Sequence, residues 1–168
     1  MSDEGVIEPT VTAATLRSAL GRYTTGVTII SCIDAAGVPV GLTANSFNAL
    51  SLDPPLVLWS LRVSSPSVEI FVMARHFAVN VLAESQVELS RRFASRTEDK
   101  FAEGLWSAGV GGAPVLAGCV AVFECATHSH QTVGDHVLFI GRVLRLCEAP
   151  VAPLLFQGGH YRMLGEVV

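Results

Sequence analysis

The sequence predicts a small β-barrel decorated by about three helices and built as one domain from residues 1–168. Six or seven segments have the β-branched composition or the apolar-polar alternation that is typical of strands. These strands follow one another without a helix between each pair, which argues against a doubly wound parallel sheet. A chain of about 100 to 200 residues usually forms a single hydrophobic core. The predicted fold class is therefore mainly β with helices.

The first predicted helix runs from Thr12 to Tyr23 and follows an amino-terminal extension of residues 1–11. Its apolar residues recur at i, i+3, i+4 and i+7, so they form one stripe along the helix. This stripe consists of Leu16, Ala19, Leu20 and Tyr23.

Three strands are predicted next because β-branched runs alternate with turn residues. They are Val27–Ile33, Val38–Ala44 and Leu56–Leu61, with a turn at Asp34–Gly37 and a loop at Asn45–Pro55.

The second half of the chain is predicted to begin with two helices. Ser65 is the expected N-cap of a helix that ends near Ala74, with Pro66 in its first turn. A capping box at Ser85–Glu88 predicts a second helix that ends near Ala94. The remaining predicted strands are Phe77–Leu82, Cys119–His128, His136–Leu146 and His160–Leu164, and residues 95–118 are expected to be irregular.

Composition raises the question of a membrane, because only 15% of residues are charged and the mean hydropathy is +0.48. The longest uncharged run, Gly104–Phe123, is interrupted by glycines and Pro114, unlike a membrane-spanning helix. The amino end has no basic segment followed by an apolar one, so no secretory signal is predicted. We expect a cytoplasmic protein that does not bind a membrane. Its apolar excess then predicts an oligomer interface or a lined ligand pocket.

Charge and cysteine content exclude other classes. The net charge is −4, and no basic cluster is longer than Arg91-Arg92, so no nucleic-acid partner is expected. The four cysteines form no CxxC pair and are expected to be buried thiols.

Hydrolase and metal chemistry are not favoured. The chain has no G-x-S-x-G motif, and the neighbours Asp135 and His136 would point to opposite faces of a strand. Strand spacing would likewise separate Cys125 from His128 and leave His128 and His130 on one face without a third ligand. We therefore predict no catalytic triad and no metal site.

Two segments are candidates for ligand binding. Residues 41–48 form a polar loop beside the apolar strand Leu56–Leu61, a combination that suits a flat heteroaromatic ligand with polar edges, although a solvated loop has the same composition. Residues 62–67 combine an arginine and several serines with a predicted helix start, which suits a phosphate, although an ordinary N-cap explains the same pattern.

A series of motifs resembles the short-chain flavin reductases, the reductase components of two-component flavin monooxygenases. The resemblance extends from about Leu16 to Leu164 and implies an antiparallel, Greek-key-like FMN-binding split barrel. The motifs are Thr43-Ala-Asn-Ser-Phe47, Ser51-x-Asp-Pro-Pro55, Phe77-x-Val-Asn-Val-Leu82, Leu89-Ser90 with Phe93-Ala94, Asp99-Lys-Phe101, Gly134-Asp-His136, Gly141-Arg-Val143 and Gly159-His-Tyr161.

The resemblance implies a role for each motif residue. The loop Thr43, Ala44, Asn45 and Ser46 would hold the isoalloxazine edge, largely by backbone amides. The ribityl chain and phosphate would lie along Ser60, Arg62, Ser64, Ser65 and Ser67, with Lys100 and Phe101 of the Asp-Lys-Phe motif nearby. The nicotinamide side would comprise His136, Gly159, His160 and Tyr161. Because Gly158 and His160 stand where relatives often carry arginine, both NADH and NADPH stay open as donors.

The implied activity is an NAD(P)H:flavin oxidoreductase that passes a hydride from nicotinamide C4 to N5 of FMN or FAD. The amides of residues 44–46 would stabilise charge on the reduced flavin, and His136 would position the carboxamide or donate a hydrogen bond to it. A satisfied core histidine is the alternative for His136. A partner monooxygenase would receive the reduced flavin, and a homodimer would bury the apolar excess. A non-catalytic flavin or haem carrier and a pyridoxamine-phosphate-oxidase-like enzyme are the alternatives on the same barrel.

Overall fold

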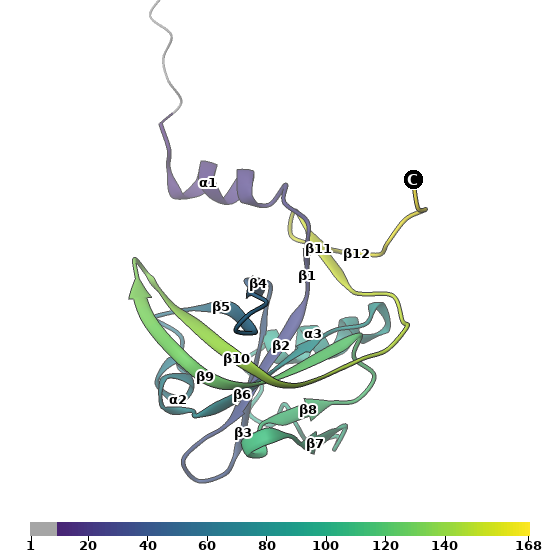
Figure 1. The fold of residues 1–168 in the computed structure, drawn as a ribbon. Coiled ribbons are helices and arrows are strands. Elements are labelled where there is room, and N and C mark those ends of the chain that lie inside the picture. Colours follow the sequence, from purple (N-terminus) through teal and green to yellow (C-terminus); the bar gives the residue numbers. More distant parts are fainter. Residues whose placement is uncertain (1–9) are drawn as a thin grey trace, which may run out of the picture.

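A computed structural model of the chain describes residues 10–168, so most of the predicted extension of residues 1–11 lies outside the described residues. Seven strands form one antiparallel sheet in the order β3-β2-β6-β9-β10-β5-β4. The sheet is strongly curved (Figure 1). These strands are β2 (Thr28–Ile33), β3 (Pro39–Ala44), β4 (Asn48–Ser51), β5 (Leu56–Arg62), β6 (His76–Val81), β9 (Ala121–Val133) and β10 (His136–Glu148).

The smaller elements surround this sheet. A three-stranded sheet contains β1 (Thr25–Gly26), β11 (Leu155–Gln157) and β12 (His160–Arg162), and a two-stranded sheet contains β7 (Trp106–Ala108) and β8 (Pro114–Leu116). The helices are α1 (Ala13–Leu20), α2 (Val68–Met73) and α3 (Val87–Ala94), with 3-10 turns at Glu84–Gln86 and Val110–Gly112. The predicted antiparallel, mainly β fold with about three helices is confirmed. Its non-sequential strand order is typical of Greek-key connections.

The order of the strands places one short segment at the seam of the barrel. β3 and β4 are the two edges of the seven-stranded sheet, yet they are consecutive in the chain. Residues 45–47 therefore cross from one edge of the curved sheet to the other. This segment belongs to the loop that the sequence predicts to hold a ligand.

Aromatic packing fills the inside of the barrel. Trp59 of β5 is fully buried and stacks on Phe139 of β10, with ring centroids 4.4 Å apart and planes at 10°. The ring of Phe71 meets Trp59 edge-on at 5.0 Å, so α2 is anchored to the barrel through this contact. Burial of such rings stabilises the fold by about 1.5–3 kcal/mol for each large side chain.

A second apolar cluster lies under α3, where a glycine permits a close approach. A Cβ atom at Gly41 of β3 would lie 2.7 Å from the ring of Phe93, closer than real side chains come. Phe93 is buried, and its ring meets Phe101 edge-on at 4.9 Å. The absence of a side chain at position 41 thus lets α3 pack directly against β3.

Several predicted elements differ in the structure. The predicted loop 45–55 contains β4, an exposed strand that forms by pairing with β5. The helix expected from Ser65 begins at Val68, because Ser65 Oγ accepts a hydrogen bond from the Ser67 amide within a turn and caps no helix. The expected capping box is also wrong, since the Ala83 amide donates to Gln86 Oε1 in a 3-10 turn that precedes α3.

The apolar stripe of α1 is not covered by the rest of the described chain. Leu16, Leu20 and Tyr23 are 50%, 62% and 70% exposed, and α1 contains no buried residue. The helix runs across the top of the molecule, from the tip of the β9–β10 hairpin toward β11 (Figure 1).

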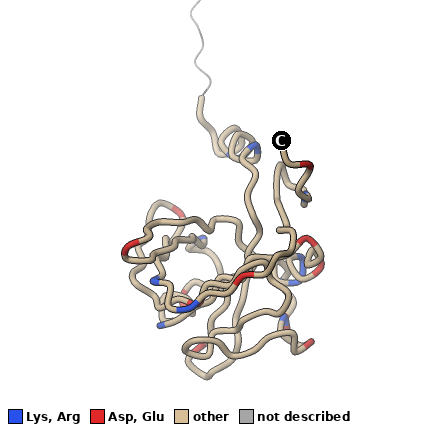
Figure 2. Tube along the Cα trace, turned by 45° about the vertical axis from the view of Figure 1, so that its right-hand side comes forward, with Lys and Arg blue, Asp and Glu red and all other residues tan. Residues whose placement is uncertain are grey.

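The charged residues are spread over the surface (Figure 2), and three of the four cysteines are buried. Figure 2 shows basic and acidic residues mixed around the periphery of residues 10–168 instead of gathered on one face. Within these residues, no helix is both long and apolar enough to cross a membrane. Cys32, Cys119 and Cys125 are buried free thiols as predicted, and burial raises the pKa of each to about 12, whereas Cys147 is exposed.

Candidate functional site

Two side-chain hydrogen bonds fix the start of the 43–46 loop, where it leaves β3. Thr43 Oγ1 donates to the carbonyl oxygen of Ser90 in α3 at 2.6 Å. Thr28 Oγ1 of the neighbouring strand donates to the carbonyl oxygen of Ala44 at 2.7 Å. The Thr43 hydroxyl hydrogen is thereby used within the protein, so Thr43 positions the loop through its side chain.

The other end of the loop is tied to β5. Ser46 Oγ accepts a hydrogen bond from the Ser60 amide and donates one to the Ser60 carbonyl, both at 2.9 Å. Two predicted ligand-binding residues, Ser46 and Ser60, are thus in direct contact across the seam of the barrel.

The middle of the loop presents free donors. The amides of Asn45 and Ser46 donate no hydrogen bond to any other residue among 10–168. An amide that is held rigidly and left unpaired can donate to a ligand without reorganisation. These two amides suit the carbonyl oxygens and ring nitrogens at the edge of a flat heteroaromatic group.

The predicted phosphate segment forms a tight turn after β5. The Ser65 amide donates to the Arg62 carbonyl at 3.0 Å, and the Ser67 amide donates to Ser65 Oγ at 3.3 Å. Arg62 and Ser64 are exposed, and Ser65 and Ser67 are half-buried. The turn gathers hydroxyl groups and one guanidinium at the end of the strand that contacts Ser46 through Ser60. Because α2 has only six residues, the helix itself contributes little to such a site.

His136 lies beside this turn. It is the first residue of β10 and the Cα partner of Arg62 on β5. The expectation that Asp135 and His136 diverge is wrong, because Asp135 lies in the hairpin turn and its Oδ1 is 2.8 Å from His136 Nδ1. This hydrogen bond, with the nearby Arg62 charge as a weaker cause, lowers the pKa of Asp135. The remaining ring nitrogen, Nε2, has no hydrogen-bond partner among residues 10–168 and is free for a ligand.

Lys100 and Phe101 lie on the α3 side of the loop. Lys100 Nζ donates to the carbonyl oxygens of Phe93 at 2.8 Å and Gly41 at 3.4 Å, and burial lowers its pKa. These bonds place its ammonium at the end of α3, where it satisfies carbonyl groups and complements the helix dipole. Phe101 fills the space between Phe93 and Trp106, so its contacts within the chain are those of a packing residue.

The predicted nicotinamide residues near the carboxyl end lie on the β11–β12 hairpin. Gly158 and Gly159 form its turn with positive φ angles, which glycine adopts without strain. His160 is exposed, with Nδ1 2.9 Å from the Gly158 carbonyl oxygen. The Tyr161 hydroxyl lies 2.9 Å from Ser90 Oγ, and its ring packs edge-on against Phe156.

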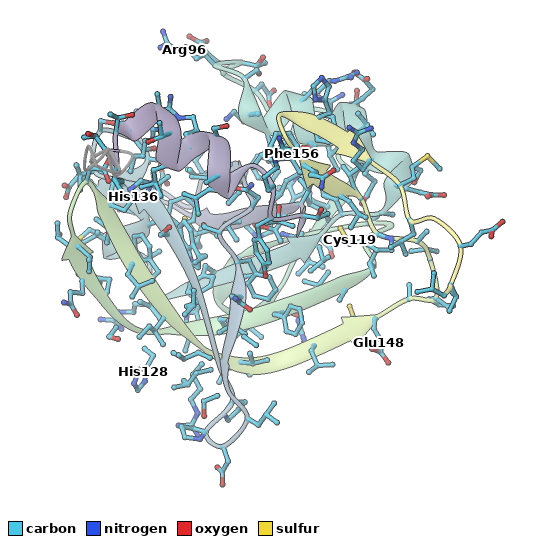
Figure 3. All side chains as sticks on the ribbon, turned by 90° about the horizontal axis from the view of Figure 1, so that it is seen from above. Arg96, Cys119, His128, His136, Glu148 and Phe156 are labelled. Atoms are coloured by element: carbon cyan, nitrogen blue, oxygen red, sulfur yellow. The ribbon has the colours of Figure 1, made fainter. Side chains whose placement is uncertain are left out.

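The predicted site residues therefore form two groups on either side of the 43–46 loop. One group follows the ends of β5 and β10, and the other surrounds α3. The structure shows no hydrogen bond or ring contact between His136 and the β11–β12 residues within residues 10–168. Seen from above, His136 and Phe156 lie near opposite ends of α1 (Figure 3).

Ser90 is the residue that sequence reasoning missed. It has no exposed surface, and it bonds both Thr43 and Tyr161. In the sequence, Ser90 was distinguished only by its place in the motif Leu89-Ser90. A single serine within an amphipathic helix forms no pattern that would indicate a functional role.

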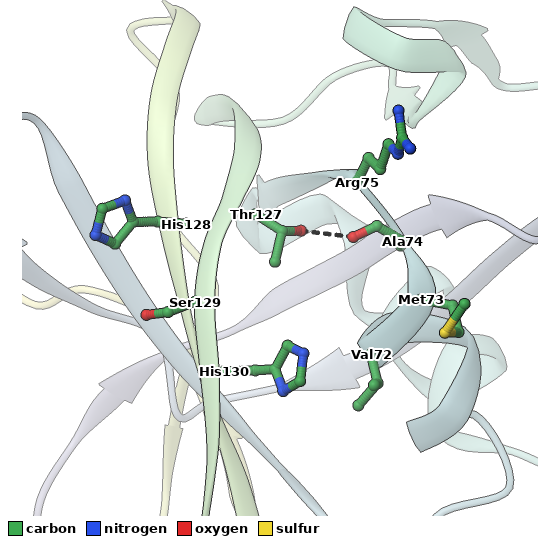
Figure 4. Close-up of a pocket in the computed structure, with 8 residues that line it drawn as sticks. All are labelled: Val72, Met73, Ala74, Arg75, Thr127, His128, Ser129 and His130. Atoms are coloured by element: carbon green, nitrogen blue, oxygen red, sulfur yellow. Dashed lines mark hydrogen bonds between the residues drawn. The ribbon is translucent and has the colours of Figure 1, made fainter.

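A separate groove lies between the end of α2 and β9, with a volume of about 630 Å³ (Figure 4). It contains none of the predicted ligand-binding residues. A β-bulge at His128 interrupts the pairing between Thr127 and Ser129, so His128 and His130 project to opposite sides of β9, contrary to the expected shared face. No group of three potential metal ligands occurs in residues 10–168. The lining residues are Val72, Met73, Ala74, Arg75, Thr127, His128, Ser129 and His130.

Comparison with known proteins gives one consistent result. The model of the flavin reductase like domain matches residues 20–165. A Rhizobium meliloti protein named "Probable flavin reductase" is 43% identical over 156 residues, which are 91% of this chain and 50% of that protein. The chain thus spans half the length of this relative. The reductase subunit of a flavin-dependent monooxygenase from Rhodococcus jostii is 43% identical over 160 residues, covering 95% of this chain and 82% of that protein.

A solved structure agrees with the sequence comparisons. The NADH:FAD oxidoreductase of Streptomyces globisporus, in complex with NAD and FAD fragments, has a TM-score of 0.87 and 36% identity. The match covers 94% of this chain and 98% of that one.

Proposed function

Because the chain belongs to the flavin reductase like domain family, we propose that it uses NADH or NADPH to reduce FMN or FAD and supplies the reduced flavin to a monooxygenase. The observation that carries the proposal is the loop at the seam of the barrel. Its amides at Asn45 and Ser46 are free, and its position is fixed on both sides by side-chain hydrogen bonds.

The loop fits the edge of an isoalloxazine ring for a physical reason. That edge carries carbonyl oxygens and ring nitrogens, which accept hydrogen bonds and gain negative charge when the flavin is reduced. Donors that are already oriented toward this charge stabilise it without reorganisation. Asn45 and Ser46 would therefore favour the reduced flavin as well as bind the oxidised one.

The turn after β5 would hold the flavin phosphate. Arg62 supplies a permanent positive charge, and Ser64, Ser65 and Ser67 supply hydroxyl donors within one tight turn. Contact between Ser46 and Ser60 joins this turn to the loop along a single strand. The same flavin would thus be held at its ring by the loop and at its phosphate by the turn.

The nicotinamide contacts would come from two separate places, His136 at the start of β10 and Tyr161 on the β11–β12 hairpin. The unpaired Nε2 of His136 suits the carboxamide, and the bond to Asp135 fixes the orientation of the ring. When bound, the cofactors would supply the redox chemistry, a hydride transfer from the nicotinamide to the flavin. The contribution of the protein is to hold those rings in register and to exclude misaligned complexes.

A matrix of two flavins against two nicotinamides tests this proposal. Purified protein is mixed with FMN or FAD and with NADH or NADPH, and loss of the nicotinamide absorbance is followed in air. We expect rapid oxidation with at least one pair. No oxidation above the protein-free rate with any of the four pairs would refute the proposed activity, and a bound chromophore that NADH leaves unchanged would indicate a carrier instead.

We further propose that the chain acts as a homodimer. The exposed apolar stripe of α1 requires a cover that the described chain does not supply, and a second copy would supply it symmetrically. The monooxygenase would then need no stable contact with the reductase, because reduced flavin can diffuse from one protein to the other.

A further inference from the structure

One buried side chain links the two sides of the proposed cofactor site. Ser90 lies in α3 with 0% of its surface exposed. Its carbonyl oxygen accepts the Thr43 hydroxyl at 2.6 Å, and its own hydroxyl lies 2.9 Å from that of Tyr161. Thr43 belongs to the proposed flavin loop and Tyr161 to the proposed nicotinamide hairpin. These two segments are distant in sequence and are joined here through a single residue.

The link depends on the close packing of α3 against β3. Gly41 has no side chain to obstruct Phe93, and Lys100 ties the end of the helix to the Gly41 carbonyl. Ser90 therefore sits on a rigid helix, with its backbone against Thr43 and its hydroxyl turned toward the hairpin. A carbonyl oxygen has two lone pairs, so the bond from Thr43 does not require the loss of a helical hydrogen bond.

The hairpin has few other polar links to this helix. Among residues 10–168, Ser90 is the only α3 residue that forms a hydrogen bond with β11 or β12. The Arg91 guanidinium lies over the Tyr161 ring at 5.7 Å, an exposed contact that constrains position less strictly than a hydrogen bond does. The hairpin is otherwise held by pairing of β11 with β1, so the Ser90 hydroxyl is its hydrogen-bonded link to α3 and, through α3, to the flavin loop.

From this geometry we infer that Ser90 is a positioning residue for hydride transfer, which sets the distance between bound nicotinamide and bound flavin through Tyr161 and Thr43. The inference rests on the proposed function. Hydride transfer requires the reacting atoms to approach within about 3–3.5 Å, and a displacement of about 1 Å can slow such a step by about 100-fold. A residue that serves only to fill the core would have no such selective effect on this step.

The test compares Ser90→Ala, Tyr161→Phe and the double variant. Each change removes one hydroxyl of the same hydrogen bond, and both keep the Thr43 bond to the Ser90 carbonyl. Single-turnover flavin reduction is measured by stopped flow, flavin affinity by fluorescence quenching, and NADH KM at steady state. Thr127→Val is the matched control, because its hydroxyl makes a similar half-buried bond to the Ala74 carbonyl at 2.7 Å outside the site.

We expect each single variant to slow flavin reduction about tenfold and to raise the NADH KM, while flavin affinity changes less than about twofold. The double variant should be no slower than the singles, because the same link is lost in all three. The control should match the wild type.

Three outcomes would decide against the inference. Unchanged reduction rates in both single variants would leave Ser90 a packing residue, and proportional loss of flavin affinity and rate would indicate general destabilisation. Additive effects in the double variant would show that the two residues act separately. If Ser90→Ala does not fold, Tyr161→Phe on a partly exposed residue still decides the question. An inactive wild type would refute the proposed function itself, whereas an active wild type with unaffected variants would refute only the role of Ser90.

Discussion

His136 and Arg62 lie directly opposite each other on the antiparallel strands β10 and β5. Residues paired in this way project from the same face of the sheet, with Cβ atoms about 4.5–5.5 Å apart. The arrangement brings the proposed nicotinamide contact next to the proposed phosphate contact, at the end of the strand that holds Ser60. A flavin bound along β5 would therefore extend toward His136.

The change His136→Ala should mainly weaken the use of NADH. Loss of the imidazole removes the contact proposed for the carboxamide, whereas the amides of the 43–46 loop stay in place. We expect an increase of about tenfold in the NADH KM, the size of one lost hydrogen bond to a bound ligand. Flavin affinity, measured by fluorescence quenching, should stay within about twofold.

His128→Ala is the matched control, because His128 is an exposed histidine of the neighbouring strand and lies outside the proposed site. Equal loss of NADH use and flavin affinity in His136→Ala would show that the residue contacts the flavin instead.

The change Ser46→Ala should have the opposite selectivity. It removes both hydrogen bonds to Ser60 and frees the end of the loop that carries the Asn45 and Ser46 amides. Each such bond contributes about 0.5–1.5 kcal/mol, so flavin affinity should fall about tenfold. The NADH KM at saturating flavin should change little. Ser107→Ala, on the exposed strand β7, serves as control, and flavin affinity unchanged by Ser46→Ala would remove the loop from the flavin site.

Stability at acid pH should depend on Glu124. Its buried carboxylate accepts hydrogen bonds from Arg145 Nε and Nη2 at 2.5 and 2.7 Å, and from the Val110 amide at 2.6 Å. These partners, Arg145 foremost, lower the pKa of Glu124 from 4.5. A carboxyl group with a lowered pKa in the folded state stabilises the fold above its unfolded pKa. That contribution is lost as the pH falls below about 4.5 and through the folded pKa.

Urea unfolding of Glu124→Gln at several pH values measures this contribution. The variant should be less stable than the wild type at pH 7 by about 1–3 kcal/mol, because a partner group is left unpaired. The difference should shrink below pH 4.5. Glu103→Gln, which breaks the exposed pair with Arg92, should leave stability nearly unchanged at every pH, because solvent screens such a pair. A difference for Glu124→Gln that is constant with pH would exclude the ionised carboxylate as its cause.

Sequence patterns predicted the elements whose signal is local. The β-branched run that became β2 and the hydrophobic strands β5 and β6 carry their own period, so their positions were close to those expected. β4 was missed because its residues are exposed and become a strand only by pairing with β5. The bulge at His128 likewise depends on β10, and it reverses the face on which His128 lies. Long-range pairing decides such features, and a window along one segment does not contain it.

Sequence patterns likewise predicted the local segments of the candidate site but not the contacts between distant segments. The 43–46 loop and the turn at 62–67 were predicted as polar residues beside apolar strands, and the structure joins them through Ser46 and Ser60. Ser90 was not predicted, because its importance arises from the approach of α3 to Gly41. Residue type says little where a contact is created by the absence of a neighbouring side chain.

The exposed apolar stripe of α1 predicts that the protein is a homodimer. A homodimer should sediment with twice the chain mass of 17.8 kDa at micromolar concentration. The double change Leu16→Glu and Leu20→Glu should convert the dimer to a monomer. Burial of each leucine contributes about 1.5–3 kcal/mol, and a symmetric interface buries each leucine once in each subunit.

Val38→Glu is the control for this double substitution, since Val38 is an equally exposed apolar residue of the β2–β3 turn at the opposite end of the molecule (Figure 1). If the wild type sediments as a monomer, the apolar stripe is not a dimer interface. If instead the Leu16 and Leu20 variant remains dimeric, the second copy binds elsewhere. If the variant becomes monomeric and flavin affinity falls with it, the two cofactor sites depend on the subunit boundary. Contacts from both subunits would then explain why His136 and Tyr161 lie apart within one chain.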